Sequence, residues 1–427
     1  MPPSRSPKMR GDSSSFGLKC PITKRNYFSP HFMNSADPTV IEPAAPTPES
    51  NPVPGALNPG PGGSWNAEIK SWIKRLPFFP ALDFYRRKAL DSPLFDFRTR
   101  TLARTLEDWP RALLIDITNR CNAKCVWCPN PDLTHLGAMD MDLYRKLIDD
   151  YGPRGGVVTF GTFGEPLMDK HMRERVEYLV RYPRIQKIEI LTNAFFLNSK
   201  IVPVLLGHSV GVDISLDELD PKTFEDVKQM SFEVVRGNIL AFLAANDRHP
   251  RPVPVNIRIK TLKPVEETLQ NPFFQSITGH ACNIVLNSID DNIISNWAGV
   301  FDKSRFLDQY KVRRSTAGRY THKRFNQENP APCTQLWKWM VVYWDGSVVL
   351  CCADMFSQHV VGNVKENSIG EIWNGPEFRS LRQSMEQRKR FETPLCQNCD
   401  IHLSWHNLHD YYDGDGRFRS DRPFIMG

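Results

Sequence analysis

Short apolar runs rich in β-branched residues alternate with helix-like segments between residues 110 and 300, and this alternation limits the fold more than any other feature. The expected strands cover residues 112–118, 156–160, 188–192, 212–215, 255–260 and 283–287. Amphipathic segments at 141–151, 171–182 and 232–246 predict helices between them. Strands separated by helices are typical of βαβ units with a parallel sheet. Six units predict an α/β fold, a partial (β/α)6 TIM-like barrel with its chemistry at the C-terminal ends of the strands.

The regions on either side of this core have different compositions. Residues 1–64 are rich in Pro, Ser, Asn and Gly, so they cannot bury enough apolar surface to offset their ordering entropy, and we expect a disordered N-terminal tail. Residues 65–109 predict a short helical preamble to the core at 110–300. Residues 325–410 contain Trp-rich, glycine-punctuated strands followed by a Cys-x2-Cys knuckle, which predicts a small second domain.

Charge and hydropathy exclude several classes of protein. The net charge of +6 over 427 residues is mild and not clustered, which argues against a nucleic-acid or polybasic membrane-surface partner. No apolar run approaches the ~18 residues that a membrane span requires, and the N-terminus lacks the apolar segment of a secretory signal. We therefore expect a cytoplasmic protein.

Eight of the ten cysteines fall into two groups, which in a reducing compartment indicates metal or cluster ligands rather than disulfides. The first group, Cys121-x3-Cys125-x2-Cys128, follows the first expected strand directly. Three thiolates can bind three irons of a four-iron cluster and leave the fourth iron open. Structural zinc normally takes four ligands, and this loop offers no fourth Cys or His. The pattern therefore favours an iron–sulfur cluster.

This spacing, with the aromatic Trp127 before the last cysteine, resembles that of the radical S-adenosylmethionine (SAM) superfamily. Three further motifs close the next three strands in the order that this family shows. They are Gly164-Glu165-Pro166, Thr192-Asn193-Ala194 and Ser215-Leu216-Asp217. Phe163 stands where the family usually has a glycine before the first of them.

The resemblance implies that the open iron of a [4Fe–4S] cluster chelates SAM. Electron transfer would cleave SAM to a 5′-deoxyadenosyl radical, which removes hydrogen from a small-molecule substrate. The electron would come from a flavodoxin or ferredoxin-type donor. The implied SAM-binding residues are Gly164, Glu165 and Pro166 at the amino group, with Asn193, Ser215 and Asp217 further along. Arg258 is expected either to pair with the SAM carboxylate or an anionic substrate, or to form an ordinary salt bridge.

The second cysteine group resembles the SPASM/twitch extensions of radical SAM enzymes. Its expected ligands are Cys333, Cys351, Cys396 and Cys399, and the resemblance implies one auxiliary [4Fe–4S] cluster without an open iron. Cys352 is an alternative to Cys351, although the spacing from Gly346 favours the latter. A four-cysteine zinc ribbon is the alternative for the whole group.

The leading functional hypothesis is an oxidoreductase or epimerase that acts on a sugar or an aminocyclitol. A saturated auxiliary cluster suits dehydrogenation, because it could take an electron from the substrate radical. Epimerisation would instead require a thiol hydrogen donor, with Cys282 or Cys352 as candidates, although a lone cysteine such as Cys282 is most often a core residue. A peptide-maturing enzyme and a zinc-binding scaffold without catalysis are the alternatives.

Overall fold

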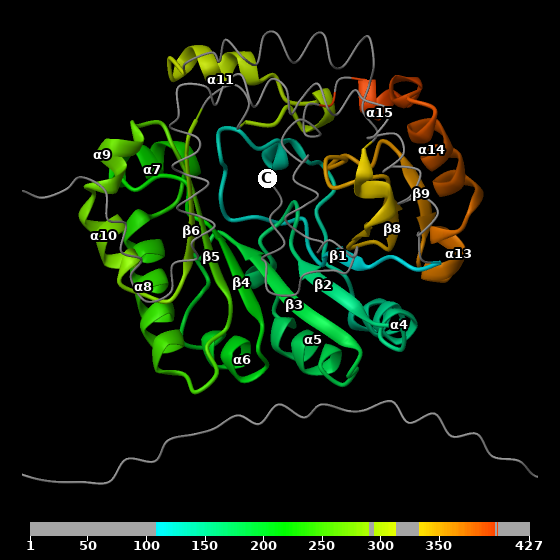
Figure 1. Ribbon diagram of the computed structural model, residues 1–427, viewed down its shortest axis with the longest axis horizontal. Helices are drawn as coiled ribbons and strands as arrows, with labels where there is room; N and C mark the ends of the chain where they lie inside the picture. Colours follow the sequence, from blue (N-terminus) through cyan, green and yellow to red (C-terminus); the bar gives the residue numbers. More distant parts are fainter. Residues whose placement is uncertain (1–107, 290–293, 313–332, 398, 400–427) are drawn as a thin grey trace, which may run out of the picture. The chain divides into compact units, whose positions relative to one another are not determined.

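All six expected strands are present and lie side by side in parallel (Figure 1). The computed structural model describes residues 108–289, 294–312, 333–397 and 399. The expected tail, almost all of the preamble and part of the segment between the core and the second domain lie outside these residues. The domain boundaries therefore stay predictions. The strands are β1 (Ala112–Asp116), β2 (Gly156–Phe160), β3 (Ile185–Thr192), β4 (Gly211–Ser215), β5 (Val255–Thr261) and β6 (Asn283–Ser288).

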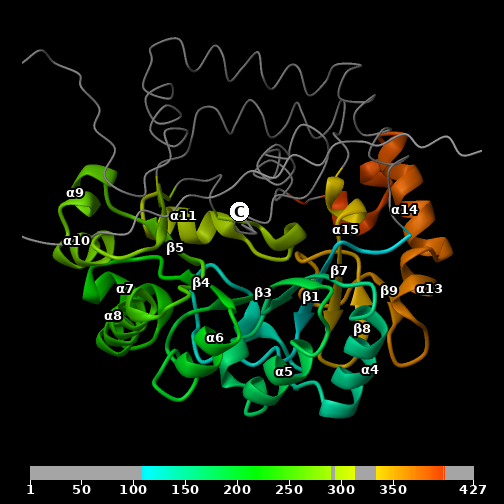
Figure 2. The same cartoon turned by 60° about the horizontal axis from the view of Figure 1, so that its bottom comes forward.

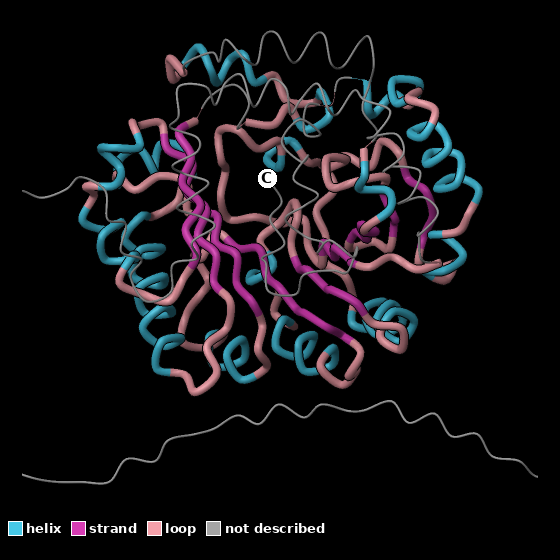
Figure 3. Tube along the Cα trace, in the orientation of Figure 1, coloured by secondary structure: helices cyan, strands magenta, loops and turns pink. Residues whose placement is uncertain are grey.

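Helices follow the strands and cover one face of the sheet, as Figure 3 shows. The three expected helices are confirmed as α4 (Met141–Tyr151), α5 (Met172–Leu179) and α8 (Phe232–Arg248). The sequence did not indicate α6 (Val202–Gly207), α7 (Pro221–Lys228), α9 (Val265–Leu269), α10 (Pro272–Thr278) or α11 (Lys303–Gln309). These helices have about two turns or fewer, which is too short for a clear amphipathic period.

The two faces of the sheet differ in chemistry. Strand residues such as Val158, Ile190 and Ile214 are buried in one apolar core together with residues of α4, α5 and α8. Successive strand residues point to opposite faces. The residues that flank Val158, Ile190 and Ile214 in the sequence therefore face the interior of the partial barrel. There β3, β4 and β5 present charged side chains, which include Glu189 and Asp213. The arrangement confirms the expected α/β fold with a partial barrel.

The C-terminal strands extend this same sheet. They are β7 (Trp339–Tyr343), β8 (Ser347–Val349) and β9 (Val360–Asn363), and the order within the described residues is β6-β5-β4-β3-β2-β1-β7-β8-β9. β7 pairs with β1 in parallel, and Ala112 lies opposite Trp339. β7 and β8 form an antiparallel hairpin whose turn contains Gly346 at φ +90°, a conformation that favours glycine. Composition had predicted a small second domain, and the strands of this region hydrogen-bond directly to the core sheet.

The remaining helices form a short C-terminal layer, seen from another side in Figure 2. They are α13 (Ile369–Trp373), α14 (Pro376–Glu386) and α15 (Pro394–Gln397). Ser368 and Glu371 form a reciprocal capping box at the start of α13. The guanidinium of Arg382 lies 4.2 Å from the centroid of the buried Trp373 ring and donates to the carbonyl of Leu336. None of the helices in the described ranges is long and apolar enough to span a membrane.

Candidate functional site

The cysteine loop lies where the sequence places it, at the C-terminal end of β1. Cys121, Cys125 and Cys128 are partly exposed, and the backbone N–H of Cys128 donates to the carbonyl of Cys125 over 3.0 Å. The last residues of α7 hold the loop from outside. The N–H of Lys124 donates to the carbonyl of Lys228 (3.1 Å), and the N–H of Val126 donates to the carbonyl of Val227 (3.0 Å). The loop is therefore fixed by backbone contacts at two points.

The Gly164-Glu165-Pro166 segment packs directly against the start of the cysteine loop. A Cβ atom on Gly164 would lie 2.0 Å from the carbonyl oxygen of Thr118, so only glycine fits here. Asp116, at the end of β1, accepts hydrogen bonds from the N–H groups of Phe163 and Gly164. Burial raises the pKa of Asp116 to about 7, although these two hydrogen bonds act in the opposite direction. Two motifs that are distant in sequence thus form one structural unit.

Replacing Gly164 with alanine should separate these two segments. We expect Gly164→Ala to lower the free energy of unfolding by about 1–3 kcal/mol through overpacking, and to lower the iron bound at the cysteine loop. The measurements are thermal unfolding and anaerobic iron analysis. The control is Gly237→Ala, since Gly237 lies inside α8 with no atom near its would-be Cβ; there we expect about 0.5–1 kcal/mol of stabilisation. Equal behaviour of the two variants would contradict the close-packing argument.

Glu165 is a buried carboxylate at the junction of β2 and β3. It accepts hydrogen bonds from the hydroxyl of Thr192 (2.7 Å) and from the N–H groups of Asn193 (2.7 Å) and Leu167 (3.1 Å). Burial raises its pKa to about 7 against the effect of these donors. An ammonium group at this carboxylate would favour its ionised form. This chemistry suits the role that the sequence assigns to Glu165.

The motif after β3 lies beside the first cysteine. The side-chain amide of Asn193 is 3.9 Å from the sulfur of Cys121 and donates to the side-chain oxygen of Asn122 over 3.0 Å. Ala194, which follows, has φ +64°. This brings Asn193 and the cysteine loop together, as expected for two parts of one site.

The motif after β4 holds a buried ion pair that the sequence did not indicate. The ammonium of Lys228 donates to a carboxylate oxygen of Asp217 (2.7 Å) and to the carbonyl of Ser215 (2.8 Å). Both charged side chains are 3% exposed. Burial alone would lower the pKa of Lys228, but Asp217 and the thiols of Cys125 and Cys121 outweigh it and raise that pKa. A fixed positive charge therefore lies close to the cysteine loop.

Arg258 forms the salt bridge that was one of its two expected arrangements. Its Nε donates to the carboxylate of Asp213 on the neighbouring strand over 2.6 Å. On the same face, Lys187 pairs with Glu189 over 2.6 Å. The interior wall formed by β3, β4 and β5 thus presents alternating charges.

The chemistry of the cysteine loop fits a cluster. Burial raises the pKa of the Cys121 and Cys128 thiols to about 12, and Lys228 opposes this only in part. Binding of a metal or cluster requires these thiols to lose their protons. Among the residues that the structure describes, no three His, Cys, Asp or Glu side chains are grouped for a single ion. A single tetrahedral zinc would bring its sulfurs to about 4 Å from one another, whereas the ligands of a cluster bind different irons.

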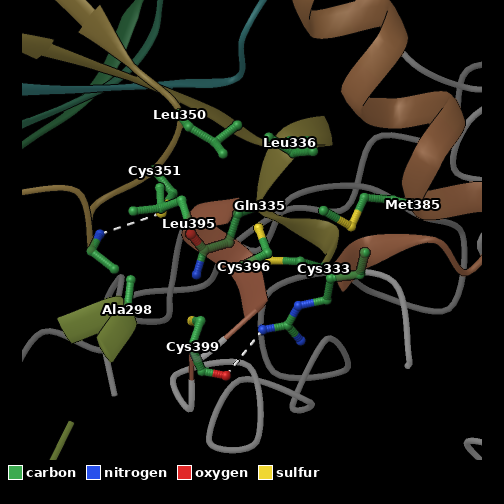
Figure 4. A pocket seen from close by; sticks show the side chains of 12 residues that line it. Ala298, Cys333, Gln335, Leu336, Leu350, Cys351, Met385, Leu395, Cys396 and Cys399 are labelled. Carbon is green, nitrogen blue, oxygen red and sulfur yellow. Dashed lines mark hydrogen bonds between the residues drawn. The ribbon is translucent and has the colours of Figure 1, made fainter. Parts of the chain in front are cut away.

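The second cysteine group converges on one pocket. Cys333, Cys351, Cys396 and Cys399 all line it, together with mostly apolar residues (Figure 4). Cys352 does not line the pocket. Its thiol is buried and lies 3.7 Å from the side-chain oxygen of Gln335. The geometry therefore favours Cys351 over Cys352 as the ligand.

A short segment, η3 (Trp297–Gly299), lies between the two cysteine groups. The indole N–H of Trp297 donates to the carbonyl of Trp127 in the cysteine loop over 3.0 Å. The next residue, Ala298, lines the pocket of the second cysteine group. Both residues have positive φ, which side chains rarely adopt. These contacts connect the segment to both cysteine groups.

Cys282 lies away from these groups. It immediately precedes β6, at the end of the parallel sheet opposite to the one that carries the cysteine loop. Its thiol is 3.7 Å from the carbonyl of Ile277 in α10. This position suits a packing residue better than a hydrogen donor.

Each of the two cysteine groups lies within a segment that matches a known domain family. Residues 115–249 match the model of the Radical SAM superfamily, and residues 333–400 match that of SPASM, an iron–sulfur cluster-binding domain. The protein is a radical SAM enzyme with a C-terminal SPASM domain, and its cofactors are a [4Fe–4S] cluster with SAM and a SPASM iron–sulfur cluster.

Two curated relatives align with this chain over most of their own length. The chain is 23% identical over 303 residues to the S-adenosyl-L-methionine-dependent 2-deoxy-scyllo-inosamine dehydrogenase of Niallia circulans, covering 70% of this chain and 96% of the relative. It is 24% identical over 325 residues to the tungsten-containing aldehyde ferredoxin oxidoreductase cofactor-modifying protein of Pyrococcus furiosus, covering 68% and 87%. The crystal structure of BtrN with AdoMet and 2-DOIA superimposes with a TM-score of 0.44 at 20% identity, covering 68% and 92%.

Proposed function

We propose that this protein is a radical SAM dehydrogenase that oxidises an alcohol carbon of a sugar or an aminocyclitol. The observation that carries the proposal is the pocket lined by Cys333, Cys351, Cys396 and Cys399. Four thiolates saturate a cluster, so the site would exchange electrons rather than bind substrate. The name of the Niallia circulans relative, a dehydrogenase of an aminocyclitol, supports the same reaction.

The residues of the first site would divide the work between them. Cys121, Cys125 and Cys128 would hold the core cluster, and Glu165 would bind the ammonium group of SAM. When bound there, the cluster and SAM would supply a radical able to remove one hydrogen atom from the substrate carbon. Completing the oxidation of the alcohol to a ketone would also release one proton and one electron, and Cys333, Cys351, Cys396 and Cys399 would hold a group able to accept that electron. The initial reducing electron would come from a flavodoxin or ferredoxin-type donor.

The interior wall of the barrel supports this choice of substrate class. The Arg258–Asp213 and Lys187–Glu189 pairs give this face cationic and anionic groups a few residues apart. Hydroxyl and amino groups of a small cyclic metabolite can hydrogen-bond to both kinds of group.

Removing the auxiliary ligands tests the proposal. We expect Cys396→Ala/Cys399→Ala to lower the iron content from about eight to about four per chain, to retain 5′-deoxyadenosine formation and to lose ketone formation. Anaerobic iron analysis and chromatography of both products measure this. The matched control is Cys352→Ala, which removes a neighbouring thiol outside the pocket and should keep the iron. Zinc in place of auxiliary iron, or ketone formation by the double variant, would overturn the dehydrogenase proposal.

A further inference from the structure

A buried arginine lies beside the four cysteines of the auxiliary pocket. Arg390 is the first residue of η5 (Arg390–Glu392). It is 1% exposed, and its side chain lines the pocket. Its Nη2 donates to the backbone carbonyl of Cys399 over 3.2 Å, a bond drawn as a dashed line in Figure 4. Nothing in the sequence marks this residue, because an arginine in a charged segment is normally a surface residue.

The charge of this guanidinium is not balanced by a carboxylate among the described residues. Within the same part of the chain, its Nε and Nη1 are buried and donate to no oxygen or nitrogen atom, and the thiol of Cys396 is its side-chain partner. A buried cation is costly unless an anion and hydrogen-bond acceptors face it. The described residues that line the pocket are otherwise apolar or amide side chains and the four cysteines. Among the described residues, the groups at this pocket that can supply the matching negative charge are the thiolates of the four cysteines.

We propose that Arg390 sets the reduction potential of the cluster that these four cysteines would hold, and so makes that cluster a better electron acceptor. This inference rests on the proposed function, because it requires iron at the pocket. Four thiolates give such a cluster a net negative charge, and reduction adds one electron without a proton. A cation in poorly hydrated surroundings stabilises the more negative, reduced form, and hydrogen bonds to sulfur act in the same direction. Arg390 is thus a positioning residue that acts through the cluster.

The test is an anaerobic redox titration of the full-length enzyme, followed by electron paramagnetic resonance. The auxiliary signal is the one that added SAM does not change. We expect Arg390→Gln to lower the ratio of reduced to oxidised cluster at least tenfold at a fixed potential, which is about 59 mV for one electron. Arg390→Lys keeps the charge but loses the planar fork, and its potential should lie between those of Arg390→Gln and the wild type. The matched control is Lys389→Gln, which removes an exposed neighbouring charge and should leave the potential unchanged.

The outcomes separate this inference from the proposed function. About four irons in the wild type would refute the auxiliary cluster itself. About eight irons with an unchanged potential in Arg390→Gln would refute the role of Arg390 alone. If Arg390→Gln does not retain auxiliary iron, Arg390→Lys decides the matter by its potential. Loss of auxiliary iron from both variants would also overturn the inference, since Arg390 would then be part of the scaffold.

Discussion

Replacing Cys121, Cys125 and Cys128 together with alanine should reduce 5′-deoxyadenosine formation to background, while about four of about eight irons remain. The three thiols lie on one loop that backbone hydrogen bonds attach to α7, whereas the auxiliary cysteines line a separate pocket. Loss of the first group therefore leaves the second intact. Iron analysis and chromatography of SAM cleavage products, both under anaerobic conditions, measure the effect.

Two comparisons make this result specific. Cys282→Ala removes a thiol from the opposite end of the sheet and should retain full cleavage activity. Spectroscopy of the triple variant should still show the auxiliary cluster, which establishes that the chain folds. Continued SAM cleavage by a folded triple variant would refute the assignment of these cysteines.

The second large effect concerns the ion pair under the cysteine loop. Lys228→Met should destabilise the protein by about 3–5 kcal/mol, because it leaves the buried carboxylate of Asp217 without its partner. Chemical denaturation measures the change. Combining Lys228→Met with Asp217→Asn should recover part of the loss, since the uncompensated charge is then gone.

The same helix offers a matched control for this prediction. Lys222 and Asp226 also form a Lys–Asp pair in α7, at 2.5 Å, but their side chains are 84% and 52% exposed. Lys222→Met should therefore leave the free energy of unfolding nearly unchanged. Similar losses in the two lysine variants would show that burial of the pair is not what matters.

Local sequence patterns were sufficient for the six core strands, for helices α4, α5 and α8, and for both cysteine groups. Each rests on information within a few residues, such as the β-branched run of β1 or the spacing from Cys121 to Cys128. The convergence of Cys333 with Cys396 and Cys399 was predicted only through family resemblance, because sequence spacing does not determine which distant thiols meet.

Features that depend on long-range packing were not predictable. Lys228 and Arg390 look like ordinary charged residues of amphipathic segments, and only the tertiary structure buries them. The pairing of β7 with β1 was also missed, because an apolar run does not state which edge it will join. Both failures have one origin, namely that the partner of each group lies far away in the chain.

The position of β1 between β2 and β7 has a consequence for how the chain is made. Its second partner, β7, comes more than two hundred residues later. While the protein leaves the ribosome, the edge of β1 that will bind β7 stays open until residue 343 has emerged, and such an edge invites association with other chains. Pairings of this kind also form slowly. The nascent polypeptide should therefore depend on chaperones until its last third is complete, and a truncation before residue 339 should promote aggregation.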